Sequence, residues 1–70
     1  MDRKIGMTIE EAAVYTGIGR NTLRNLVQFD KLPVLRIGRK HIVRTEILEQ
    51  FMVANQGVDL LDMDTVRAVK

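Results

Sequence analysis

The chain contains no cysteine, one proline and one histidine among its 70 residues. Without cysteine there are no disulfide bonds, no thiolate metal ligands and no cysteine nucleophile. The single histidine, His41, has no carboxylates at a spacing suited to zinc, so we expect no metal and no other cofactor. The sequence also shows no paired nucleophile and base and no phosphate-binding loop. We therefore expect a protein that is not an enzyme.

Long apolar runs are also missing. No segment approaches the roughly 18 residues of a membrane span, and the charged residues 1–4 are not followed by the apolar region of a signal peptide. These features predict a cytoplasmic protein that binds neither a membrane nor a small-molecule ligand. Aromatic residues are limited to Tyr15, Phe29 and Phe51. The core of this single small domain must therefore be mostly aliphatic.

The charges of the chain are distributed unevenly. Residues 20–44 carry seven basic side chains and one acidic side chain, whereas residues 45–70 carry five acidic and two basic ones. A polyanion is attracted to the middle segment and repelled by the end of the chain. A basic cluster is more often a solvated face than a binding site. Its meaning depends on the motif in which it lies.

A helix-turn-helix pattern begins at Thr8. Thr8 and Glu11 have the spacing of a capping box, which predicts the start of a first helix. Gly17 predicts the end of that helix in a left-handed conformation. Ala13 lies four residues earlier, where a small side chain allows two helices to cross closely. An ordinary packed corner of two helices has the same spacing, so the pattern alone does not identify DNA binding.

A second amphipathic helix is predicted over residues 20–29. Leu23, Leu26 and Val27 form one apolar stripe at helical spacing, and polar side chains form the opposite stripe. Such a helix buries one side and presents amides and an arginine on the other. This exposed polar face favours a binding role over simple packing.

A β-hairpin and a third helix are expected next. Residues 34–37 and 41–44 are β-prone, and Gly38, Arg39 and Lys40 lie between them. This predicts a two-stranded wing with a basic tip. Thr45 is a suitable N-cap for a helix over residues 46–54, with acidic side chains in its first turn.

These elements predict an α+β, mostly helical fold: a winged helix-turn-helix with an acidic C-terminal tail. We expect a loose N-terminal arm over residues 1–7 and a DNA-binding domain over residues 8–54. Residues 55–70 are expected to be a short helix or a flexible segment. The apolar side chains of this tail favour packing on the body, or contact with a protein partner or another copy.

The candidate site follows from the shape of duplex DNA. A major groove admits one α-helix, and arginine and asparagine can read guanine and adenine there. The base-reading candidates are Arg20, Asn21, Thr22, Arg24, Asn25 and Gln28. The candidates for the DNA backbone or minor groove are Arg36, Gly38, Arg39, Lys40, His41 and Arg44. The helix N-terminus at Thr8 is a further candidate for a phosphate. Each arginine also has a simpler explanation, solvation or pairing with Glu46 or Glu49.

Three segments together resemble the excisionase family, small winged-helix proteins related to the DNA-binding domains of mercury-resistance-type regulators. They are residues 7–13 (MTIEEAA), 16–23 (TGIGRNTL) and 31–40 (KLPVLRIGRK). The resemblance spans about residues 7–54. It identifies residues 20–28 as the recognition helix and residues 38–40 as the wing tip. Two positions depart from the family pattern, Gly19 in place of a serine or threonine and His41 in place of an aromatic residue.

The resemblance implies a bacterial, nucleoid-associated recombination directionality factor. Such a protein binds and bends attachment-site DNA of a phage or conjugative transposon and helps a tyrosine recombinase, the integrase, to excise the element. The expected partners are double-stranded DNA, this integrase and further copies of the chain on adjacent DNA sites. A small transcriptional regulator with the same DNA-binding unit is the main alternative. A protein-interaction module that uses the tail is another.

Overall fold

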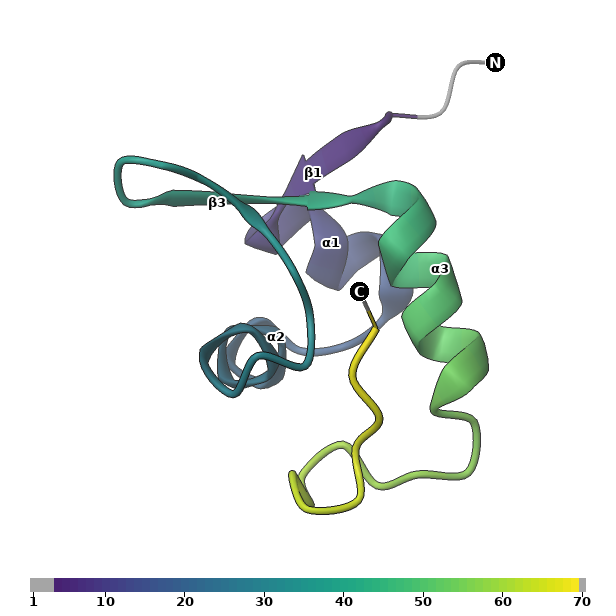
Figure 1. The fold of residues 1–70 in the computed structure, drawn as a ribbon. Helices are drawn as coiled ribbons and strands as arrows, with labels where there is room; N and C mark the ends of the chain where they lie inside the picture. Colours follow the sequence, from purple (N-terminus) through teal and green to yellow (C-terminus); the bar gives the residue numbers. More distant parts are fainter. Residues whose placement is uncertain (1–3, 70) are drawn as a thin grey trace.

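The computed structural model describes residues 4–69 as three helices and a three-stranded antiparallel sheet (Figure 1). In chain order the elements are β1 (Gly6–Thr8), α1 (Ile9–Thr16), α2 (Arg20–Gln28), β2 (Leu35–Ile37), β3 (Lys40–Arg44) and α3 (Thr45–Ala54). The β2–β3 hairpin projects beyond the helices as the wing (Figure 1). The predicted winged helix-turn-helix is confirmed. No helix in the described residues is long and apolar enough to cross a membrane.

Helix α1 begins and ends where its sequence predicts. The Glu11 N–H donates to Thr8 Oγ1 at 3.1 Å, and the Thr8 N–H donates to the Glu11 carboxylate at 3.0 Å, which completes the capping box. Gly17 ends the helix with φ 79°, a conformation that costs glycine little. Ala12 is fully buried, whereas Ala13, the small residue singled out by the spacing, is only partly buried.

Strand β3 is the centre of the sheet, with β1 on one side and β2 on the other. Strand β1 includes two residues expected in a loose arm, Gly6 and Met7, so that expectation is wrong for them. A strand of three residues is too short to show the alternation of apolar and polar side chains that predicts a strand. It forms because its backbone pairs with the edge of β3. Gly6 permits the approach, since a Cβ there would lie 2.8 Å from Ile42 Cγ2. The expected arm also includes residues 1–3, which lie outside the described residues.

Thr45 is not the N-cap of α3, contrary to the sequence prediction. The helix begins at Thr45 itself, and the cap position belongs to Arg44, whose side chain makes no capping hydrogen bond. Thr45 is buried, its hydroxyl donates to the Lys4 carbonyl, and its N–H donates to the Ile5 carbonyl at 2.8 Å. These bonds attach the start of α3 to the chain preceding β1.

The core lies between the helices and the inner face of the sheet, and it is aliphatic apart from one aromatic ring. Its buried members are Met7, Ile9, Ala12, Leu23, Leu26, Leu32, Val43, Ile47, Leu48, Phe51 and Val66. Every helix contributes to this cluster, so each helix is held by its apolar face. Val66 comes from the tail, which is therefore continuous with the core.

The tail forms neither a helix nor a strand over residues 55–69. It makes consecutive turns and returns along the opening between α2 and α3 (Figure 1). The short helix that its pattern allowed is thus not formed. Apolar side chains of the tail pack against the core, so this segment is also not free of the body.

The turn between α1 and α2 gives a direct test of the backbone. We expect Gly17→Ala to lower the free energy of unfolding by about 1–2 kcal/mol, because an alanine must then adopt the left-handed conformation. Gly19, two residues on, has an ordinary φ of −60° and no side-chain cap. We expect Gly19→Ser to raise stability by a few tenths of a kcal/mol through a new cap. Urea unfolding followed by circular dichroism measures both, and an unchanged Gly17→Ala midpoint contradicts the proposed constraint.

Candidate nucleic-acid interface

Helix α2 presents most of its predicted reading face to solvent. Leu23 and Leu26 are fully buried and determine the rotation of the helix about its axis. Five of the six candidates are then exposed, namely Arg20, Asn21, Arg24, Asn25 and Gln28. Thr22 is partly buried at the side of this face. The polar stripe therefore emerges on one accessible surface of the molecule.

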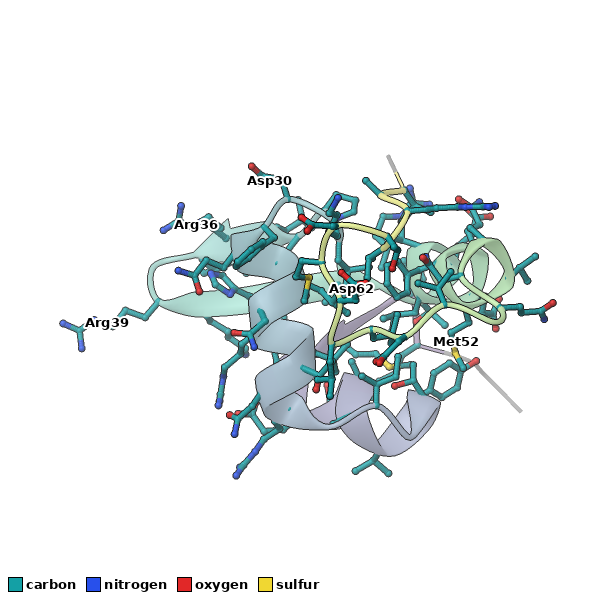
Figure 2. All side chains as sticks on the ribbon, turned by 90° about the horizontal axis from the view of Figure 1, so that it is seen from below. Asp30, Arg36, Arg39, Met52 and Asp62 are labelled. Atoms are coloured by element: carbon teal, nitrogen blue, oxygen red, sulfur yellow. The ribbon has the colours of Figure 1, made fainter. Side chains whose placement is uncertain are left out.

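The wing is a hairpin closed by the two residues Gly38 and Arg39. Ile37 pairs with Lys40 across the turn, and Gly38 has φ 61°, which suits the first position of a type II′ turn. Arg36 lies opposite His41 in the register of the two strands. Arg36 and Arg39 extend from the wing away from the body (Figure 2). The hairpin thus carries its basic side chains to the edge of the molecule.

A groove runs between the second half of α2 and the wing. Its volume is about 900 Å³. We call it the helix–wing groove, and its lining residues are Arg24, Val27, Gln28, Asp30, Leu32, Pro33, Val34, Arg36, Arg39, His41 and Val69. It brings together base-reading candidates from α2 and backbone candidates from the wing. This juxtaposition is the central feature of the candidate interface.

Other predicted residues lie outside this groove. Arg20, Asn21 and Asn25 are exposed on α2, and Lys40 is exposed on the wing. Arg44 lies at the far end of β3, where its guanidinium donates to the Glu46 carboxylate at 3.3 Å. Pairing with a neighbouring acid, which the sequence left open for this arginine, is therefore what the structure shows.

Arg24 also has an acidic neighbour, on α1. Its guanidinium donates to the Glu10 carboxylate at 3.0 Å and to the Asn21 side-chain oxygen at 3.4 Å. Both members of the Arg24–Glu10 pair are about half exposed. Such surface pairs contribute roughly 0–1 kcal/mol, so a phosphate or base can replace the carboxylate at little cost. Within residues 4–69, Arg36 and Arg39 form no ion pair.

Thr8 does not suit the phosphate role predicted for it. Its hydroxyl caps α1, and the Glu11 carboxylate occupies the helix N-terminus. Hydrogen bonds from the Lys4 ammonium and from the Thr8 N–H lower the pKa of Glu11 below its ordinary value. The Glu11 carboxylate, paired with the Lys4 ammonium, thus already lies at the helix end where a phosphate was expected. The N-terminus of α2 differs, since it has no side-chain cap and no acid in its first turn.

Sequence reasoning missed two residues that line the helix–wing groove. Asp30 is the acidic side chain in the lining, and it adopts φ 58°, which asparagine and aspartate tolerate better than most residues. Val69, from the tail, reaches the same groove although it is 28 residues beyond His41. No local pattern could have placed Val69, because its position depends on how distant segments pack.

The match to known proteins rests on most of the chain. A family model described as a helix-turn-helix domain matches residues 7–56. The chain belongs to this helix-turn-helix family. The comparisons with curated proteins and with solved structures give no match. Membership of the helix-turn-helix family indicates DNA binding, and such domains are typically not enzymatic.

Asp30 provides a test of the helix–wing groove in this helix-turn-helix protein. Two unit charges about 7 Å apart in water interact by about 0.6 kcal/mol, which corresponds to roughly a threefold change in affinity. We therefore expect Asp30→Asn to bind duplex DNA about threefold more tightly at low salt, because one repulsion is removed. Fluorescence anisotropy with a labelled duplex measures the change.

The matched control is Asp62→Asn in the tail, on the other side of α2 from the wing (Figure 2). Both variants change the net charge equally, and asparagine can keep the local turn at either position. We expect no change for the control. Equal gains for the two variants mean that only the overall charge matters and that Asp30 does not face the DNA.

Proposed function

We propose that this chain is an excisionase, a recombination directionality factor of a mobile element such as a phage or conjugative transposon. It binds and bends attachment-site DNA and helps a tyrosine integrase to excise the element. Copies of the chain occupy adjacent sites on the same DNA. The chain itself supplies no catalytic group to the reaction.

The helix–wing groove is the observation that carries this proposal. It has the arginines Arg24, Arg36 and Arg39 on its walls and an exposed path between a helix and a hairpin. A sugar–phosphate backbone is a long, narrow polyanion, and it fits between two such walls. With the backbone seated there, α2 faces the major groove on one side and the wing tip faces the minor groove on the other.

The roles within the interface follow from this placement. Residues of the exposed α2 face contact base edges, since arginine and asparagine offer the required donors and acceptors. At the wing tip, Gly38 allows close approach and Arg39 enters the minor groove or contacts its phosphates. Arg36 and Lys40 contact phosphates beside it, and His41 lies in the groove wall. Thr8 is left out of this interface because of the carboxylates at its helix end.

Bending is a physical consequence of holding the duplex from two sides. A helix in one groove and a wing in the next are joined by one rigid body, so the duplex must follow their separation. Deforming a site of 20–30 base pairs by 40–90° costs about 1–6 kcal/mol, which additional contacts repay. A bent attachment arm brings distant recombinase sites together. Excision uses such a bend, whereas occupancy of a promoter does not require one.

The two walls of the groove are expected to respond differently to mutation. Arg24→Ala removes a side chain that reads bases, so we expect specific binding to weaken about tenfold and binding to random DNA to change much less. Arg39→Ala removes a phosphate or minor-groove contact. We expect it to weaken both kinds of binding equally and to reduce the log–log salt slope by about 0.9. Identical behaviour of the two variants contradicts the assignment of reading to α2 and positioning to the wing.

Selection of bound duplexes from a randomised pool, followed by sequencing, tests the function itself. We expect tandem direct repeats, because an excisionase places copies side by side along an attachment arm. Circular-permutation electrophoresis of the selected sequence then measures the bend. A palindromic site without a bend contradicts the proposal and favours the small transcriptional regulator, which acts as a two-fold dimer.

A further inference from the structure

The tail, residues 55–69, connects the end of α3 to the end of α2. It leaves α3 at residue 55, crosses the opening between the helices and reaches the end of α2 (Figure 1). Val66 is only 4% exposed and fills a place in the core. In the view from below, the tail, which carries Asp62, lies between α2 and α3 (Figure 2). Its path links elements that are not adjacent in the sequence.

Asn55, at the start of the tail, holds the returning chain near its end. The Asn55 side-chain amide donates to the Phe51 carbonyl at 3.0 Å and to the Arg67 carbonyl at 2.9 Å. Its side-chain oxygen accepts from the Arg67 N–H at 2.7 Å. The residue is buried, so these bonds are shielded from competing water. One amide therefore clamps the returning chain to the end of α3.

The tail ends at the peptide that leads from α2 into the wing. The Val69 N–H donates to the Lys31 carbonyl at 3.2 Å. The backbone N–H of Lys31 donates to the Leu26 carbonyl at 2.8 Å, and the backbone N–H of Asp30 donates to the Val27 carbonyl at 3.1 Å. Together these two bonds form a Schellman motif that ends α2. Lys31 thus terminates the helix through its N–H and receives the tail through its carbonyl.

The position of α2 relative to the wing depends on this junction. Helix α2 packs chiefly on α1, and the wing strands pair with each other and with β1. The direct connection between helix and wing is the loop of residues 29–34, whose end at α2 carries the bond from Val69. Val69 also lines the helix–wing groove. Restraining the loop restrains the width of that groove.

We propose that residues 55–69 form a clasp that positions the recognition helix relative to the wing and so belongs to the DNA-binding unit. The clasp contributes through geometry, because its acidic side chains would repel phosphates and none of them lines the helix–wing groove. This inference rests on the proposed DNA binding by the helix–wing groove. It assigns Asn55 and Val69 as positioning residues of the interface.

Val69→Pro tests the clasp at its bond to Lys31. Proline has no N–H, so the variant loses the bond to Lys31 while Asn55 and Val66 are unchanged. Val69→Ala is compared with it, because alanine keeps the N–H while it shortens the side chain that packs against the core. We expect Val69→Pro to weaken binding to the selected duplex about threefold to tenfold. We expect its log–log salt slope to fall by about 0.9, since the helix and wing no longer contact all their phosphates together.

A second variant acts on the clamp. Asn55→Asp replaces the donor amide by a carboxylate facing two carbonyls, and we expect the same loss of affinity. One control is Gln56→Glu, which adds the same charge at the exposed neighbouring position, and another is Ile47→Val, a core change in α3 that lowers stability. All three variants are assayed at a temperature where circular dichroism shows them fully folded. A merely structural role predicts that all folded variants bind alike with the wild-type salt slope, and that result overturns the clasp.

Failure of the clasp is separable from failure of DNA binding. If the unaltered chain binds no duplex, the proposed function fails, and residual dipolar couplings of wild type and Val69→Pro then judge the clasp. A changed angle between α2 and β3 supports it, and an unchanged angle rejects it. If the unaltered chain binds DNA and Val69→Pro binds equally well, only the clasp is overturned.

Discussion

Burial of Leu23 and Leu26 is the constraint on which the rest of the candidate interface depends. Both side chains are fully removed from water, and burying each contributes about 1.5–3 kcal/mol. In a domain of this size that is a large share of the total stability. The two leucines set the rotation of α2, and the rotation decides that its amides and arginines face outward. Any change that rotates the helix exposes leucine and hides the polar face together.

The basic and acidic side chains of this small molecule lie on different segments, so its electrostatic field is less uniform than its net charge of +2 indicates. The basic side chains of the wing extend on one side, and Asp62 of the tail lies on another (Figure 2). The molecule measures 32 × 29 × 21 Å. Since the Debye length at physiological salt is about 8 Å, charges on opposite sides scarcely interact. A polyanion at the wing therefore meets mainly the basic residues.

Two arginines of the candidate interface form weak ion pairs, whose carboxylates a DNA phosphate can replace. Glu10 pairs with Arg24 and Glu46 with Arg44, all of them at half-exposed positions. These pairs orient the guanidinium groups in the free protein, yet each contributes so little that phosphates can displace the carboxylates. Arg36 and Arg39 of the wing, by contrast, have no acidic partner within residues 4–69. The two walls of the helix–wing groove therefore differ in how much must be rearranged when a ligand binds.

The sequence by itself determined the features that arise from neighbouring residues. The capping box at Thr8, the left-handed Gly17, the buried stripe of α2 and the hairpin all have patterns that local geometry explains. Tertiary structure alone decided the pairing of β1, the use of the Thr45 hydroxyl on the Lys4 carbonyl, and the path of the tail to Lys31. Hydrogen bonds of this second kind join residues up to 41 positions apart, and a hydroxyl or an N–H carries no mark of which distant carbonyl it will meet. The helix–wing groove was likewise decided by the tertiary structure, because its lining residues come from segments that only the packed core brings together.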